Sequence, residues 1–265
     1  MQRIIKCLYQ AAFRTIEHDG VEHSGYMSFM VLLTIFPFLV FLLALTSFVG
    51  ASELGKNFIT ILLESMPELA TDSIKTRINE LGKTPPQSLM TLAIMGSIWT
   101  ASSFVECLRT ILNRVYEIKS PPTYIRRRLL SIAQFLVISI FITFAMLILI
   151  IVPIILQMIE EHKHTLTLFR YVIIFCSLFI TSSSLYYIIP NAKLNFTDVV
   201  PGALLTVILW VISGYLLSTY IIYYNQLSII YGSLGSIIVT LIFFYIINMI
   251  FIYGAEFNYL LREYP

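Results

Sequence analysis

The sequence predicts an all-α, polytopic membrane protein with six transmembrane helices, an amphipathic N-terminal helix and a helical outer loop between the first two spans. Two observations carry this prediction. Of the 265 residues, 58% are hydrophobic and only 12% are charged, a composition foreign to soluble globular domains. The hydrophobic residues also gather in six long runs, and a run that crosses lipid must satisfy its own backbone as a helix.

The N-terminal segment, residues 1–27, is expected to form an amphipathic helix on the cytoplasmic side. Apolar side chains recur in it at helical spacing, while the basic residues keep mostly to other faces. The apolar set is Ile4, Leu8, Ala11, Ala12, Thr15 and Ile16. Such a helix suits two positions, one flat on the lipid headgroups and one packed against the rest of the protein. The sequence leaves both open.

The six-helix transmembrane domain is expected over residues 28–258, with a cytoplasmic tail at 259–265. The runs in chain order cover residues 28–49, 89–105, 129–159, 168–189, 199–223 and 234–258. The third run exceeds the ~20 residues that cross a bilayer, so it must tilt, bend or protrude. Proline removes a backbone donor and glycine permits tight turns, so these residues mark expected kinks or turns. They are Pro37, Pro190, Pro201, Gly232 and Gly235.

Two connecting segments are long enough to have structure of their own. The outer loop, residues 50–88, carries apolar side chains at helical spacing and is expected to form two short amphipathic helices. These helices could cover a cavity, lie on the outer leaflet or serve as a packed connector. The cytoplasmic loop, residues 106–128, begins as a continuation of the second helix and ends in three consecutive arginines.

The distribution of basic residues predicts the orientation. If the N-terminus is cytoplasmic, eleven of the seventeen Lys and Arg residues fall on the cytoplasmic side. The positive-inside rule therefore places both termini in the cytoplasm.

Polar side chains concentrate in the cytoplasmic half of the second, fourth and sixth spans. The candidate set is Ser102, Ser103, Glu106, Arg109, Thr181, Ser182, Ser183, Ser184, Tyr245, Asn248 and Glu256. Polar groups are costly in hydrocarbon unless they face water or one another, so the set is expected to line a cavity open to the cytoplasm. Hydroxyls that bond to their own helix are the alternative. Glu256 could pair with Arg109, bind a cation or proton, or fill an interfacial role.

The sequence offers little for catalysis. His162 and His164 lie in a short outer loop and are not expected to form a metal site. Cys7, Cys107 and Cys176 have neither disulfide nor metal spacing and are expected to pack as small hydrophobes. The near balance of 17 basic and 15 acidic residues does not suggest a nucleic-acid partner. No catalytic residue, metal or cofactor is therefore predicted.

Five segments, in this order, resemble the YihY/virulence factor BrkB family. They are Tyr26 to Leu45 (YMSFMVLLTIFPFLVFLLAL), Leu112 to Tyr116 (LNRVY), Leu185 to Ala203 (LYYIIPNAKLNFTDVVPGA), Tyr231 to Gly235 (YGSLG) and Gly254 to Asn258 (GAEFN). The resemblance implies a six-helix protein of the bacterial inner membrane. Members of this family were formerly called ribonuclease BN, some are associated with virulence, and transport of a lipid or other amphipath has been entertained for them.

The expected function is transport or flipping of a lipid or another amphipathic solute through the cytoplasm-facing cavity. A non-transporting protein that organises the membrane or binds a partner is the second hypothesis, and a membrane-bound enzyme is the third. Membrane lipids are the expected partners, and a homo-oligomer stays open.

Overall fold

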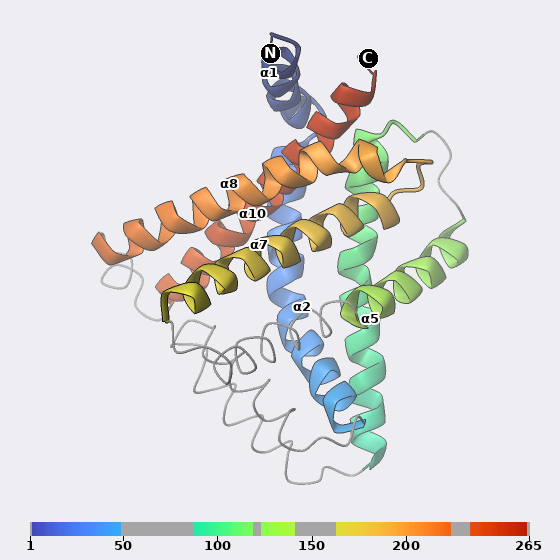
Figure 1. Ribbon diagram of the computed structural model, residues 1–265. Coiled ribbons are helices and arrows are strands. Elements are labelled where there is room, and N and C mark those ends of the chain that lie inside the picture. Colours follow the sequence, from blue (N-terminus) through green and yellow to red (C-terminus); the bar gives the residue numbers. More distant parts are fainter. Residues whose placement is uncertain (1, 49–86, 119–122, 141–162, 224–233, 264–265) are drawn as a thin grey trace.

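The computed structural model describes residues 2–48, 87–118, 123–140, 163–223 and 234–263 (Figure 1). All regular structure in these ranges is helical, which confirms the all-α prediction for this part of the chain. The helices are α1 (Gln2–Glu17), α2 (Gly20–Phe48), α5 (Gln87–Val115), α7 (Lys163–Ile188), α8 (Phe196–Tyr223) and α10 (Leu234–Glu263). Residues 124–140 form a further helical segment. The predicted outer-loop helices and the second half of the predicted third span lie outside the described residues.

Three of the described helices are long and apolar enough to cross a membrane. The qualifying stretches are Tyr171–Ile188 in α7, Phe196–Tyr220 in α8 and Ile237–Glu263 in α10. They coincide with the predicted fourth, fifth and sixth spans. The described residues thus include three membrane-length helices, and the count of six spans stays a prediction.

Helices α2 and α5 lie side by side and run in opposite directions (Figure 1). The small side chains of Ser97 and Ala101 are buried on α5. Small residues let helix backbones approach closely, which matters where lipid provides no hydrophobic drive for association. The small residues of α5 thus suit its close packing in the bundle.

Helix α5 continues well past the predicted end of the second span. Its apolar face extends through Leu108, Ile111, Leu112 and Val115, all of them buried in the main hydrophobic core. The sequence correctly indicated that the helix continues, and the structure shows that this continuation packs inside the protein rather than projecting into water.

Helices α8 and α10 pack closely through two glycines. A Cβ atom on Gly202 would collide with the carbonyl oxygen of Gly254, and one on Gly254 would collide with the hydroxyl of Thr206. Beside this crossing, the buried Tyr186 of α7 donates a hydrogen bond of 2.6 Å to the carbonyl oxygen of Phe251. Small residues and one buried tyrosine thus join α7, α8 and α10.

One end of the molecule gathers α1, the start of α2 and the C-terminal ends of α5 and α10 (Figure 1). Here Cys7 and Ala11 of α1 pack against Phe257 and Leu260 of α10. The N- and C-terminal helices therefore meet directly, and their polar side chains meet beside this contact.

The cysteines were all expected to pack as small hydrophobes. Cys7 and Cys107 are buried, whereas Cys176 is exposed, so the expectation is wrong for Cys176.

Candidate functional site

The carboxylate of Glu256 is the centre of a charged cluster at this end of the molecule. Glu256 lies in α10 and is 0% exposed. Its Oε2 accepts a hydrogen bond of 3.0 Å from Nε of Arg14, and its Oε1 lies 2.5 Å from Nδ1 of His18. Arg14 belongs to α1, and His18 follows that helix by one residue. Helix α1 and the turn that follows it thus supply both basic partners of a fully buried carboxylate.

Arg14 makes two further contacts that tie this cluster to other elements. Its second donor group, Nη2, lies 2.9 Å from Oε1 of Glu117, just beyond the end of α5. Its guanidinium carbon lies 4.5 Å from the centre of the Tyr259 ring on α10, a cation–π distance. We call Arg14, His18, Glu117, Glu256 and Tyr259 the Glu256 cluster.

The ends of α1 and α5 exchange ion pairs reciprocally. Arg14 near the end of α1 pairs with Glu117 after α5, and Arg114 near the end of α5 lies 2.5 Å from Asp19 after α1. Both acidic residues have left-handed backbones, with φ of 56° at Asp19 and 53° at Glu117. That region disfavours residues with a Cβ atom, so surrounding contacts must hold these turns in place. The ion pairs are such contacts.

The charges in this cluster shift the pKa values of its members outside the membrane-length helices. Burial acts to lower the pKa of Arg14, but its hydrogen bonds to Glu117 and Glu256 outweigh burial and raise it. The hydrogen bond from Arg14 lowers the pKa of Glu117, against a smaller opposing effect of burial. Both groups therefore hold their charges more firmly than in water.

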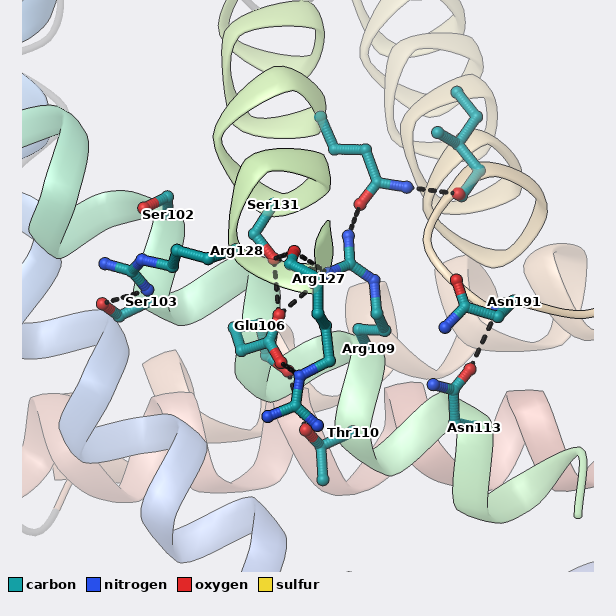
Figure 2. A network of polar contacts seen from close by, with 12 residues as sticks. Ser102, Ser103, Glu106, Arg109, Thr110, Asn113, Arg127, Arg128, Ser131 and Asn191 are labelled. Atoms are coloured by element: carbon teal, nitrogen blue, oxygen red, sulfur yellow. Dashed lines mark hydrogen bonds and ion pairs between the residues drawn. The ribbon is translucent and has the colours of Figure 1, made fainter. Parts of the chain in front are cut away.

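A second polar cluster surrounds Arg109, deeper along α5 (Figure 2). Arg109 is 0% exposed, and its Nη1 donates to Oε2 of Glu106 at 2.8 Å, to Oγ of Ser131 at 2.5 Å and to the carbonyl oxygen of Arg127 at 2.8 Å. Its Nη2 donates to Gln134. Glu106 also pairs with Arg127 and accepts a hydrogen bond of 2.6 Å from Ser131. These contacts bind the 124–140 helix to α5.

Arg128 joins the same two helices through a different set of contacts. It donates to Oγ of Ser103 at 3.1 Å and to the carbonyl oxygen of Trp99 at 2.7 Å. Its guanidinium carbon lies 4.0 Å from the centre of the Trp99 ring. Two of the three consecutive arginines are thus engaged by α5.

The predicted residues on α5 are brought together only in part. Ser103, Glu106 and Arg109 all contact the 124–140 helix, as Figure 2 shows. The hydroxyl of the buried Ser102 instead donates to the carbonyl oxygen of Trp99 at 2.9 Å. Of the pairings left open for Glu256, that with Arg109 is absent, because Glu256 contacts Arg14 and His18 and Arg109 contacts Glu106.

The predicted residues on α7 and α10 are buried or partly buried. Ser182 is buried and donates to the carbonyl oxygen of Phe179 in its own helix at 3.1 Å, whereas the buried hydroxyl of Ser183 has no hydrogen-bond partner among the described residues. Thr181 and Ser184 are partly buried. On α10, Asn248 is buried and Tyr245 is partly buried. That these residues line a common cavity stays a prediction.

The residues expected at kinks or turns fall in several settings. Pro190 lies in the connection between α7 and α8, while Pro201 lies inside the first turns of α8. Pro37 lies within α2, and Gly235 lies in the first turn of α10. Gly232 is outside the described residues.

The basic half of the Glu256 cluster was not predicted from the sequence. Arg14 and His18 are four residues apart and so share one helical face, a signal that could have paired them with each other. Their carboxylate partner is more than 200 residues away, with separations of 242 and 238 residues. No local pattern could have identified it.

Within the described part of the chain, no group of three His, Cys, Asp or Glu residues could hold a metal ion.

Comparison with known proteins assigns the chain to a family. The family model described as Virulence factor BrkB matches residues 12–264. The putative ribonuclease-like protein YfkH of Bacillus subtilis is 30% identical over 93% of this chain and 91% of its own length. A UPF0761 membrane protein of Vibrio vulnificus is 22% identical over 94% of this chain and 80% of its own length. A UPF0761 membrane protein of Photobacterium profundum is 26% identical over 94% of this chain and 79% of its own length.

No solved structure matches the chain significantly. The family match covers nearly the whole chain, the UPF0761 relatives are membrane proteins by name, and the structure contains helices able to cross a membrane. This protein is therefore a membrane protein that belongs to the BrkB family.

Proposed function

We propose that the protein moves a lipid or another amphipathic solute across the bacterial inner membrane, along a path that opens beside the Glu256 cluster. The observation that carries this proposal is the complete burial of the Glu256 carboxylate in a membrane-length helix. A charge in such a helix is expensive, and ionisable residues inside membrane proteins commonly mark the route of an ion or substrate.

The origin of the partners suggests how the path would open. Arg14 and His18 reach Glu256 from the N-terminal helix rather than from the helices that flank α10 in the bundle. If α1 moved away from the end of α10, the carboxylate would lose both partners and face whatever entered in their place. It could then bind the ammonium group of a lipid headgroup or accept a proton.

We further propose that both termini lie in the cytoplasm, so that the path opens toward that side. The excess of Lys and Arg on the same side as the N-terminus supports this orientation. The meeting of α1 with the end of α10 supports it as well, since it puts both termini at one end of the molecule.

A second function, organising the membrane or binding a partner without transport, is favoured by a different observation. The charges of Glu106, Arg109 and Glu256 are all paired within the chain. Such pairs could simply fix the shape of the bundle.

The name of the Bacillus relative would suggest a third function, cleavage of RNA. This function ranks last because Arg127 pairs with Glu106 and Arg128 stacks on Trp99, so these arginines do not form an open groove for RNA.

Movement of fluorescent phospholipids between the leaflets of reconstituted vesicles tests the proposal. Vesicles containing the wild-type protein are expected to expose labelled lipid to an external quencher faster than empty vesicles. Glu256→Gln keeps the shape but removes the charge, and should slow this movement roughly tenfold, the effect of about 1.4 kcal/mol on a barrier. Glu22→Gln is the matched control and should move lipid at the wild-type rate, because it removes an exposed carboxylate of α2 that is not part of the Glu256 cluster.

Two outcomes would contradict the proposal. A Glu256→Gln protein that inserts normally and moves lipid at the wild-type rate would remove Glu256 from the mechanism. Wild-type vesicles that behave like empty ones, across several headgroup types, would favour the organising function instead.

A further inference from the structure

Helix α1 carries apolar side chains on two opposite faces, and only one face is covered. The inward face presents Cys7 and Ala11 to Phe257 and Leu260 of α10. Two hydrogen bonds secure this face: Nη2 of Arg3 donates to the carbonyl oxygen of Leu261 at 2.9 Å, and the hydroxyl of Tyr253 donates to that of Leu8 at 3.1 Å. The packing of α1 on the rest of the protein is thereby accounted for.

The outward face presents four large apolar side chains. At about 100° per residue they fall within roughly 80° of helix circumference, on the side away from Cys7 and Ala11. Their exposed fractions are 60% for Ile5, 67% for Tyr9, 51% for Phe13 and 61% for Ile16. The rings of Tyr9 and Phe13 also contact each other, with centroids 4.7 Å apart. Exposing a continuous apolar strip of this size to water is unfavourable, so something other than water is expected to cover it.

The position and charge of α1 indicate what covers this strip. Its inward face is fixed to the last turns of α10, whose membrane-length stretch runs from Ile237 to Glu263, so α1 lies where that helix leaves the lipid. Lys6 is exposed beside the apolar strip, and Arg3 is exposed near the start of the helix. Apolar and aromatic residues edged by basic ones are typical of helices that lie at the boundary between headgroups and acyl chains of an anionic membrane.

We infer that the outward face of α1 is embedded in the headgroup boundary of an anionic bilayer while its inward face holds α10. The two positions that the sequence left open are then both occupied, one by each face. This anchoring does not depend on the proposed transport.

Spin labels on the full-length protein in lipid nanodiscs test this inference. The exposed Cys176 is first replaced by serine, and the buried Cys7 and Cys107 are kept. A nitroxide is then attached through Tyr9→Cys on the outward face, or through Glu17→Cys on the polar face as the control. With anionic lipids, the label at position 9 should collide with oxygen more than with a water-soluble nickel chelate, and the label at position 17 should show the reverse. Phe13→Cys provides a second outward position.

The same measurement separates the alternatives. A label at position 9 as accessible to nickel as the label at position 17 would overturn the inference. Spin–spin broadening at position 9 that disappears on dilution with unlabelled protein would assign the face to a second copy instead. Lys6→Gln, or nanodiscs without anionic lipid, should make position 9 more accessible to nickel, and an unchanged value would refute the role of charge.

Discussion

Arg109 shows how a charged side chain is accommodated inside this bundle. Its guanidinium is fully buried, and its two terminal nitrogens are used by Glu106, Ser131, Gln134 and the backbone of Arg127. A planar guanidinium with several donors suits such a site better than an ammonium group would. Burying the pair is expensive, but leaving one member without the other is more so.

Removing the carboxylate of this pair is therefore expected to destabilise the protein. Glu106→Gln leaves the buried Arg109 without a counter-charge and should cost about 3 kcal/mol, the lower range for breaking a buried ion pair. Thermal unfolding in detergent measures the loss. Glu22→Gln, which removes an exposed carboxylate from α2, is the control and should unfold at the wild-type temperature. Equal unfolding of the two variants would show that the Arg109 pair contributes little.

The ion pair between Arg14 and Glu117 predicts a dependence of stability on pH. Arg14 lowers the pKa of Glu117 in the folded protein below its ordinary value of 4.5. The stabilisation is therefore fully present above that value and is lost as the pH falls through the lowered pKa. Because Glu117 is largely exposed, the effect should be small. Unfolding temperatures measured from neutral to acidic pH should fall less steeply in Glu117→Gln, and parallel curves would contradict the assignment.

At the scale of elements, the crossing of α8 and α10 depends on the absence of side chains. Gly202 and Gly254 meet backbone to backbone, and the side chain of Asn258 completes the contact by accepting a hydrogen bond of 2.6 Å from the Gly202 amide and donating one of 3.1 Å to the Val199 carbonyl. In a membrane, close packing and buried hydrogen bonds are the main forces that join helices.

This packing gives a prediction with a control in the neighbouring helix. Gly254→Ala places a methyl group against Thr206 and 2.6 Å from the hydroxyl of Tyr186, and should destabilise the protein by about 1–3 kcal/mol through overpacking. A Cβ atom on Gly214 of α8 would meet no atom within 4 Å, so Gly214→Ala should be neutral or stabilising. Unfolding in detergent compares the two. A Gly254→Ala protein as stable as Gly214→Ala would show that the crossing can relax.

The helices themselves were largely predictable, and their surroundings were not. Apolar runs and family motifs predicted α7, α8 and α10 because length and hydropathy are local properties. The burial of α5 beyond residue 105 was not predicted, because the charges of Glu106 and Arg109 look like a water-facing turn. Both side chains instead hydrogen-bond to the 124–140 helix, a contact that the local sequence pattern does not contain.

At the scale of the whole molecule, the candidate site depends on contacts between the two ends of the chain. The sequence singled out Glu256 because a carboxylate in an apolar run is costly anywhere. Its partners Arg14 and His18 could not be predicted, since hydrophobic periodicity says nothing about which distant segment lies beside it. The sequence therefore predicted the residue that needs neutralising, and the fold identifies which residues neutralise it.

On the proposed mechanism, Glu256 is a working group of the lipid path and Arg14 only restrains it. Lipid movement in vesicles containing Arg14→Gln or Glu256→Gln, at equal amounts of inserted protein, tests this division of roles most directly. The two variants should differ: Arg14→Gln removes one contact between α1 and α10 but keeps the carboxylate and should move lipid at least as fast as the wild type, whereas Glu256→Gln should be slower by roughly tenfold. Equal loss in both variants would mean that the pair is structural and that Glu256 has no working role in the path.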